Sequence, residues 1–227
     1  MPLAAGVEGH TVYLAEEYVA AESLDIALRH YAPAALETAL PFLNQLAGAI
    51  DFARARGVGH GALHPRDIFL APEIARATGF GIVQALERLG LRAPVRRPYS
   101  APERVSGRAW STPADVFALG AVAHELLTGK RPAGTGEVAA IVGKATESYP
   151  DLLRGGLGRA LAEDPAARFA SAKGFVTALE AAARGETAAP VEPARPESAR
   201  PESARPEPAR PEPARPEPVR PEPVEGV

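Results

Sequence analysis

Two histidines and an aspartate lie within eight residues of each other, and these residue types can support metal or acid–base chemistry. His60 and His64 are four positions apart, the spacing of two zinc ligands on one helix face, and Asp67 offers carboxylate oxygens to a hard cation. Gly61 and Pro65 disfavour a helix here, and the H-E-x-x-H pattern of zinc peptidases is absent. A zinc-binding helix is therefore not expected.

Other residue types narrow the choice of chemistry further. The chain has no cysteine, which excludes disulfides, thiolate metal ligands and Cys nucleophiles. Ser100 and Ser111 have no base at a recognisable spacing, so neither is expected to be a nucleophile. The formal net charge is −3, and no part of the chain has the basic excess of a nucleic-acid binder. No long apolar run or signal-peptide pattern is visible, which favours a cytoplasmic protein without a membrane partner.

The composition changes near residue 187. From Pro190 onward the chain holds 12 of its 24 prolines, and Arg-Pro-Glu recurs every five residues from Arg195 to Arg220. Such a segment cannot form a helix or a sheet interior, so residues 186–227 are expected to be a disordered, polyproline-II-like tail. A solvated linker and a docking segment for a proline-reading domain both remain open.

The body before this tail is mostly helical by its hydrophobic pattern. Strands are predicted at Thr11–Val19 and Ile68–Leu70, because both runs are rich in β-branched and aromatic residues. Helices are predicted from Ser23 to His30, with Ser23 as N-cap, and from Pro33 to about Arg56. Irregular structure is expected from Gly59 to about Arg108, apart from the second strand.

A stronger helix is predicted from Thr112 to Leu127. Thr112 is a suitable N-cap, Pro113 suits the first turn, and Asp115 complements the helix dipole. This helix is apolar on nearly every side, so it should lie at the centre of its domain, and Gly129 should end it. Three further helices are predicted, near 136–147, 150–163 and 171–183.

Six short motifs in order resemble those of bacterial Ser/Thr protein kinases. They are VYLAEEYVAAESL at 12–24, VGHGALHPRDIFL at 58–70, TGFG at 78–81, YSAPE at 99–103, DVFALGAVAHELLTGKRP at 115–132 and DPAARF at 164–169. The resemblance implies an α+β, mainly α fold. It comprises a remnant of the N-lobe sheet and the hinge at 1–20, a kinase-like C-lobe at 21–185, and the disordered tail at 186–227.

The resemblance also shows where the chain departs from the family pattern. The catalytic-loop Asp that accepts the substrate proton aligns with Ala62, and the metal-binding Asp of D-F-G aligns with Gly79. The loop Arg aligns with Gly61 and its Lys with His64. The second metal ligand, normally Asn, is Asp67, which still offers oxygen to a cation.

These departures predict that the chain is not an enzyme. The Gly-rich loop and the ATP-binding Lys should precede residue 11, where ten residues cannot hold them, although the true start could lie upstream. In the family pattern a Thr usually connects the substrate-binding loop to the catalytic loop, and Arg96 aligns with that Thr. The chain is therefore interpreted as a pseudokinase, a protein-interaction or regulatory module whose partner is an active kinase or its substrate, with no cofactor.

Two alternatives are kept. One is a Ser/Thr kinase-like enzyme with residual binding of ATP and Mg²⁺, in which Glu17, Val19 and Leu70 contact the nucleotide and Asp67 the metal. The other is a decayed gene product.

The resemblance implies four structural residues. Glu103 and Arg168 should form a buried ion pair, and Asp115 should accept hydrogen bonds from N–H groups of the catalytic loop. His60 should be the structural histidine of that loop.

Overall fold

A computed structural model describes residues 2–9, 11–136 and 150–186 of the chain. The predicted helix near 136–147 and the predicted Pro-rich tail lie outside these ranges almost entirely, so they stay predictions. Within the described part the architecture is α+β and mainly helical, as the sequence indicates.

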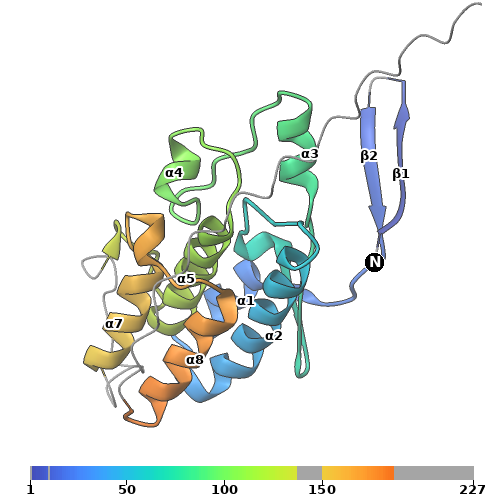
Figure 1. Ribbon diagram of the computed structural model, residues 1–227. Coiled ribbons are helices and arrows are strands. Elements are labelled where there is room, and N and C mark those ends of the chain that lie inside the picture. Colours follow the sequence, from blue (N-terminus) through green and yellow to red (C-terminus); the bar gives the residue numbers. More distant parts are fainter. Residues whose placement is uncertain (1, 10, 137–149, 187–227) are drawn as a thin grey trace, which may run out of the picture. The chain divides into compact units, whose positions relative to one another are not determined.

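Helix α5, Thr112–Thr128, lies at the centre of the helical body (Figure 1). Its side chains are buried on nearly every face, because α2 (Leu36–Arg54), α7 (Pro150–Ala160) and α8 (Ala172–Ala183) all pack against it. Ser111, one residue before the predicted cap, is the N-cap, and Gly129 ends the helix in the left-handed conformation at φ 68°. The all-round apolar pattern therefore identifies the central helix correctly.

Helix α2 is shorter than predicted at its beginning. The predicted start at Pro33 lies in a loop. The helix begins at Leu36 and contains Pro41 in its second turn. Its buried stripe includes Leu43, Leu46 and Ile50 and faces α5 and α8. At its far end the Asp51 carboxylate accepts hydrogen bonds from the Ala172 and Lys173 N–H groups, which begin α8.

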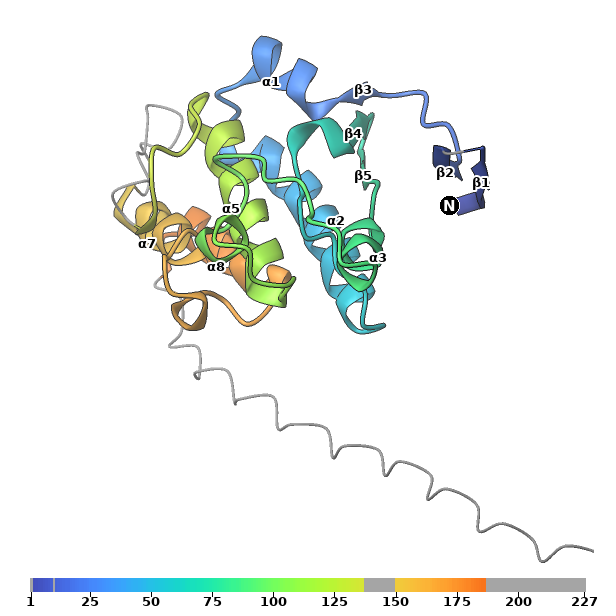
Figure 2. The ribbon, with the colours of Figure 1, turned by 90° about the horizontal axis from the view of Figure 1, so that it is seen from above.

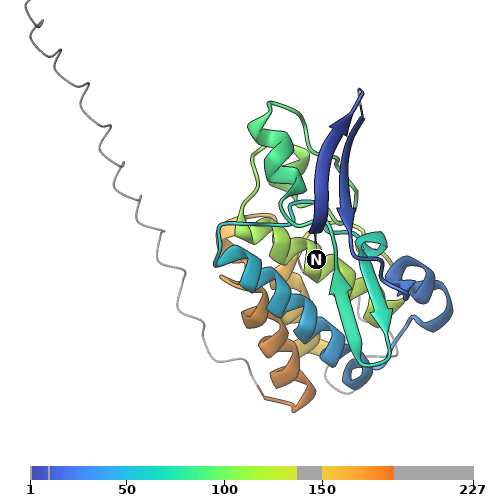
Figure 3. The same ribbon diagram turned by 90° about the vertical axis from the view of Figure 1, so that its right-hand side faces the viewer.

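Two small antiparallel sheets complete the described fold. Strands β1 (Pro2–Glu8) and β2 (Thr11–Glu16) form a hairpin, while β3 (Glu22–Ser23), β4 (Ile68–Ala71) and β5 (Ile74–Ala77) form a three-stranded sheet in the order β3-β4-β5. Figure 3 shows β4 and β5 as a ribbon running beside α2, and β5 packs against that helix. Helix α1, Leu24–Tyr31, follows β3 directly.

The segment from residue 59 to 108 is more regular than the sequence predicts. It contains a 3-10 turn, η1 (Pro65–Asp67), strand β5, and the short helices α3 (Ile82–Arg88) and α4 (Pro102–Val105). A second 3-10 turn, η3 (Pro165–Ala167), precedes α8. In Figure 2, seen from above, the chain passes from the end of β5 into α3. These short elements bring the catalytic-loop region, residues 58–70, against the start of α5.

Candidate functional site

The Asp115 carboxylate fixes the backbone of the loop that carries the candidate catalytic positions. It accepts hydrogen bonds from the N–H groups of His60 and Gly61, at 2.9 and 2.7 Å, and from Nε1 of Trp110 at 2.8 Å. Burial raises the pKa of Asp115, while the three donated hydrogen bonds favour its charged form. The first turn of α5 and the loop are thereby locked together.

Trp110 and Val83 fill the space beside two loop glycines. A Cβ atom on Gly59 would lie 1.8 Å from Cε2 of Trp110, and one on Gly61 would lie 2.7 Å from Cγ1 of Val83. Gly61 also has a φ of 75°, a left-handed conformation that side chains disfavour. Gly61 aligns with the arginine of the family pattern, and the Trp110 indole ring packs beside it.

The two positions that depart from the catalytic pattern carry no polar side chain. Ala62 is buried and offers no proton acceptor, and Gly79 has a φ of 89° and no carboxylate. A Cβ on Gly79 would lie 3.7 Å from Nε2 of His60. His60 is buried, packs edge-on against Phe80 with ring centroids 5.2 Å apart, and forms no ring hydrogen bond with the described residues.

Asp67, the candidate metal ligand, is paired with an arginine. Its Oδ2 lies 2.6 Å from Nη1 of Arg96 and 3.9 Å from Nε2 of His60. Its backbone carbonyl accepts a 2.9 Å hydrogen bond from the Thr78 N–H, which ties the TGFG segment to the loop. Among the described residues no group of three or more His, Cys, Asp or Glu side chains could hold a metal ion.

Of the three nucleotide-contact candidates, only Val19 lines a cavity of about 190 Å³ beside β4 and β5. Val19 lines this cavity, whereas Leu70 packs against the hydrophobic core, so Phe69 rather than Leu70 faces the cavity. The Glu17 carboxylate lies 4.0 Å from Nη1 of Arg76. The cavity is lined by Tyr18, Val19, Ala20, Ala21, Phe69, Ala71, Ile74 and Arg76. Its walls are mainly apolar, as the faces of a purine ring require.

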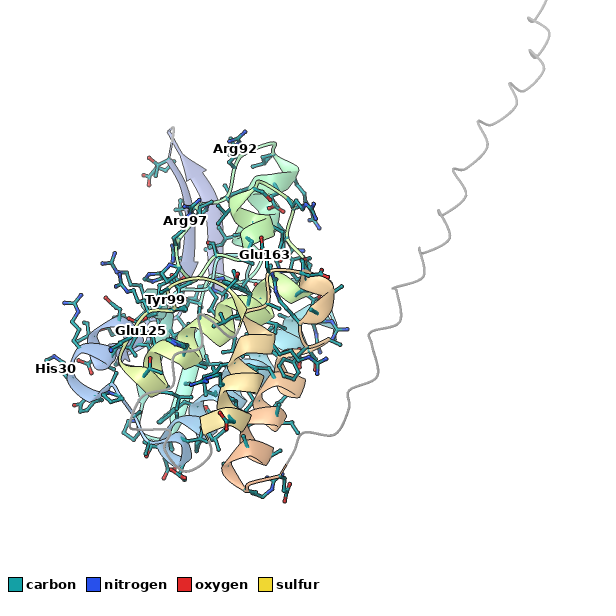
Figure 4. All side chains as sticks on the ribbon, turned by 90° about the vertical axis from the view of Figure 1, so that its left-hand side faces the viewer. His30, Arg92, Arg97, Tyr99, Glu125 and Glu163 are labelled. Atoms are coloured by element: carbon teal, nitrogen blue, oxygen red, sulfur yellow. The ribbon has the colours of Figure 1, made fainter. Side chains whose placement is uncertain are left out.

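A second and more polar hollow of about 390 Å³ lies between α1, η1 and α5. The Tyr99 hydroxyl donates a hydrogen bond to the Glu125 carboxylate there, and Figure 4 shows these two side chains together. Burial and the Glu125 carboxylate raise the pKa of Tyr99, so its phenol stays protonated. His64 also lines this hollow, and burial, reinforced by the nearby Arg96 charge, lowers its pKa.

A buried ion pair joins the YSAPE motif, through Glu103 in α4, to the turn before α8. Nη1 and Nη2 of Arg168 donate to the two carboxylate oxygens of Glu103, at 2.6 and 2.8 Å. Arg168 also donates to the backbone carbonyls of Pro113, Ala162 and Glu163. The guanidinium is thus surrounded by acceptors, as a buried charge requires.

Three residues of this site escaped the sequence reasoning. Phe69 was missed because β-strand alternation alone does not say which face of β4 meets a cavity. Trp110 was missed because its role depends on glycines 51 and 49 positions earlier in the chain. Arg96 was noted only as a replacement for Thr, and no local pattern links it to Asp67.

Comparisons with known proteins identify the family. The protein kinase domain family matches residues 5–165 of the chain. The chain is similar to serine/threonine-protein kinase PknA of Mycobacterium tuberculosis, with 32% identity over 195 residues that cover 78% of this chain and 44% of the relative. It is also 30% identical over 203 residues to serine/threonine-protein kinases drp72 of Corynebacterium efficiens, covering 83% of this chain and 38% of that protein.

A solved structure agrees with these relatives. The crystal structure of the Mycobacterium tuberculosis PknI kinase domain matches with a TM-score of 0.62 and 27% identity, covering 80% of this chain and 70% of that one. The chain therefore belongs to the protein kinase family. It spans less than half the length of the curated relatives that it matches.

One prediction from the sequence is wrong. The chain was expected not to be an enzyme because Ala62 and Gly79 replace two catalytic aspartates, but the family match and the Ser/Thr kinase relatives at 30–32% identity point to a kinase enzyme. The expectation depended on the replacements at Ala62 and Gly79, whereas the family match extends over residues 5–165. The interaction role and its partner stay predictions. Separately, none of the helices in the described ranges has the length and apolarity to cross a membrane.

Proposed function

We propose that this chain is part of a Ser/Thr protein kinase that binds ATP and transfers its γ-phosphoryl group to a hydroxyl group of a protein. The observation that carries the proposal is the apolar cavity beside β4, which lies next to the catalytic-loop region. Asp67 directly precedes β4, and Phe69, two residues later, lines the cavity. At about 3.3 Å per residue, a nucleotide base in the cavity would leave its phosphates within reach of the loop.

The protein substrate would lie in the polar hollow between α1 and α5. Its lining includes both carboxylates, Asp25 and Glu125, and three arginines, Arg29, Arg66 and Arg131, so it offers partners to charged and polar peptide groups. Each carboxylate already has an arginine neighbour, at 3.4 Å for Arg66 to Asp25 and for Arg131 to Glu125. Residues 21–185 would form the lobe that positions this substrate.

The absence of a proton acceptor at Ala62 predicts slow transfer. General-base catalysis contributes roughly 10²–10⁴-fold in enzymes that use it. Phosphoryl transfer depends mainly on positioning and on charge stabilisation, because its transition state is loose. We therefore expect low but measurable turnover.

Mg²⁺, which kinases use with ATP, does not fit the donor set of this site. The carboxylate expected from the D-F-G motif is missing at Gly79, and the Asp67 carboxylate is engaged by Arg96 at 2.6 Å. Mg²⁺ needs near-octahedral oxygen ligation, with one or two carboxylates besides the phosphates. No step of the proposed reaction is therefore assigned to a protein-bound metal.

Titration calorimetry with ATP, followed by transfer of labelled γ-phosphate to casein, tests the proposal. Phe69→Ala should weaken ATP binding about tenfold, because it removes an aromatic wall of the cavity. Phe52→Ala is the matched control, since Phe52 is an exposed phenylalanine on α2. A wild-type chain that binds no ATP, with or without Mg²⁺, would overturn the proposal, and so would equal affinities of the two variants.

A further inference from the structure

The Asp67 carboxylate is engaged by a cation from its own chain. Nη1 of Arg96 lies 2.6 Å from Oδ2 of Asp67, within the range of a charge-assisted hydrogen bond. A divalent cation on the same carboxylate would be placed directly beside the guanidinium charge. Metal and arginine therefore compete for this oxygen.

No second side chain near Asp67, among the described residues, would help to bind a divalent cation. Gly79 has no side chain to offer, and His60 is buried with its Nε2 3.9 Å from the same Oδ2. Within the described ranges, no three His, Cys, Asp or Glu side chains lie close enough together to share a metal ion. A single shared carboxylate is a poor anchor for Mg²⁺, which dehydrates reluctantly.

Arg96 keeps donors available for an anion. A guanidinium has five N–H groups, and only Nη1 is hydrogen bonded to a described residue. The Arg96 side chain is 37% exposed, so its Nε and Nη2 groups can meet a ligand. The arginine is also held in place, since its backbone N–H donates a 2.8 Å hydrogen bond to Oγ of the buried Ser100.

One further hydrogen-bond donor lies near this arginine. Arg66 belongs to the same 3-10 turn as Asp67, and His64 precedes it with its Nδ1 accepting the Arg66 N–H at 3.1 Å. That bond leaves Nε2 of the neutral imidazole as an N–H donor. His64 and Arg96 thus offer N–H donors near the turn that precedes β4, whereas Arg66 is paired with Asp25 at 3.4 Å.

We propose that Arg96, in place of a protein-bound Mg²⁺, receives the phosphates of the nucleotide, so that nucleotide binding does not require a divalent cation. This inference rests on the proposed function, because it assumes that ATP occupies the cavity beside β4. Asp67 then orients the guanidinium through Nη1, while Nε and Nη2 bind phosphate oxygens. Arg96 is thereby a phosphate-binding residue of the site.

The experiment compares ATP binding to the full 227-residue chain in EDTA and in MgCl₂ by titration calorimetry. The wild type should bind ATP in EDTA as tightly as in MgCl₂. Arg96→Met should weaken binding in EDTA about tenfold or more, the loss of one or two charge-assisted hydrogen bonds. Asp67→Asn should weaken binding to the same small extent in EDTA and in MgCl₂, because it loosens the orientation of the guanidinium without removing it.

Arg97→Met is the matched control. Arg97 is the next residue, is exposed, and forms no hydrogen bond or ion pair with a described residue (Figure 4). It carries the same charge, so it reports any general electrostatic effect. Circular dichroism melts of all variants confirm that each one is folded.

The outcomes separate the inference from the proposed function. Binding that appears only with MgCl₂, or that Arg96→Met and Arg97→Met weaken equally, overturns the role of Arg96 and leaves ATP binding intact. Weaker binding of Asp67→Asn in MgCl₂ but not in EDTA also overturns it, since that pattern identifies a metal ligand. No ATP binding in either buffer overturns the proposed function itself.

Discussion

Two arginine–carboxylate pairs in this lobe have the same closest contact and opposite surroundings. Arg168 approaches Glu103 to 2.6 Å with both side chains almost fully buried, and Arg96 approaches Asp67 to the same distance with both side chains partly exposed. The buried guanidinium has five protein acceptors around it, whereas the exposed one has a single acceptor among the described residues. Distance alone therefore does not distinguish a pair that holds the fold from one that is free to exchange partners.

The largest expected effect comes from breaking the buried pair. Arg168→Met leaves the Glu103 carboxylate uncompensated in the interior, which should lower the free energy of unfolding by about 3–5 kcal/mol. Urea unfolding followed by circular dichroism measures this change. The double variant Glu103→Gln with Arg168→Met should cost less than the sum of the single changes, because it removes both charges.

Arg96→Met provides the contrast on the exposed pair. Solvent screens this pair, so its loss should change the unfolding free energy by no more than about 1 kcal/mol. Equal destabilisation by Arg96→Met and Arg168→Met would remove the distinction between the two pairs.

An intermediate effect is expected where the catalytic-loop region meets Trp110 and Val83. Gly61→Ala combines a left-handed backbone with a Cβ 2.7 Å from Val83, so it should cost about 2–4 kcal/mol. Gly57→Ala has a similar φ of 71° and open space around its Cβ, and should cost only about 1 kcal/mol. The difference between the urea midpoints of the two variants measures the steric cost of the clash with Val83. Identical midpoints would contradict the close packing of Val83 against Gly61.

The smallest effect concerns the pH dependence of stability that His64, a neighbour of the exposed pair, contributes. Burial, with the Arg96 charge, holds the pKa of His64 below its ordinary value of 6.5. The unfolded chain therefore takes up a proton first as the pH falls through 6.5, so this contribution to stability is complete above 6.5 and is lost below it.

His64→Gln should consequently flatten the pH dependence of the urea midpoint between about pH 5 and pH 8. His30→Gln, on the exposed surface of α1, is the matched control and should leave the slope as in the wild type (Figure 4). A His64→Gln profile that matches the wild type would show that His64 does not couple to folding.

The sequence predicts best where a single segment carries the whole signal. Helix α5 was predicted to within one residue at each end because its apolar residues, Pro113 and Gly129 lie in one continuous stretch. Helix α3 was missed because it is only seven residues long and lies among glycines and prolines that indicate turns. Strand β5 was missed because its four residues, IARA, have no β-branched run beyond Ile74.

The candidate site divides in the same way. The order of the motifs predicts the ion pair of Glu103 with Arg168 and the hydrogen bonds of Asp115 with the catalytic loop, because each of these residues lies in a recognisable motif. The contact between Arg96 and Asp67 joins residues 29 positions apart, and neither the charge pattern nor the spacing indicates it. The apolar cavity likewise depends on which face of β4 meets the segment at 18–21, a tertiary fact that strand alternation cannot supply.

The close fit between Gly59 and Trp110 has a consequence for the history of this sequence. A side chain at position 59 cannot coexist with the present indole, because its first carbon would overlap Cε2 at 1.8 Å. The two positions must therefore change together, or residue 110 must become smaller first. Among relatives, a residue other than glycine at 59 should accompany a smaller residue at 110, so this pair is expected to covary although the two positions are 51 apart.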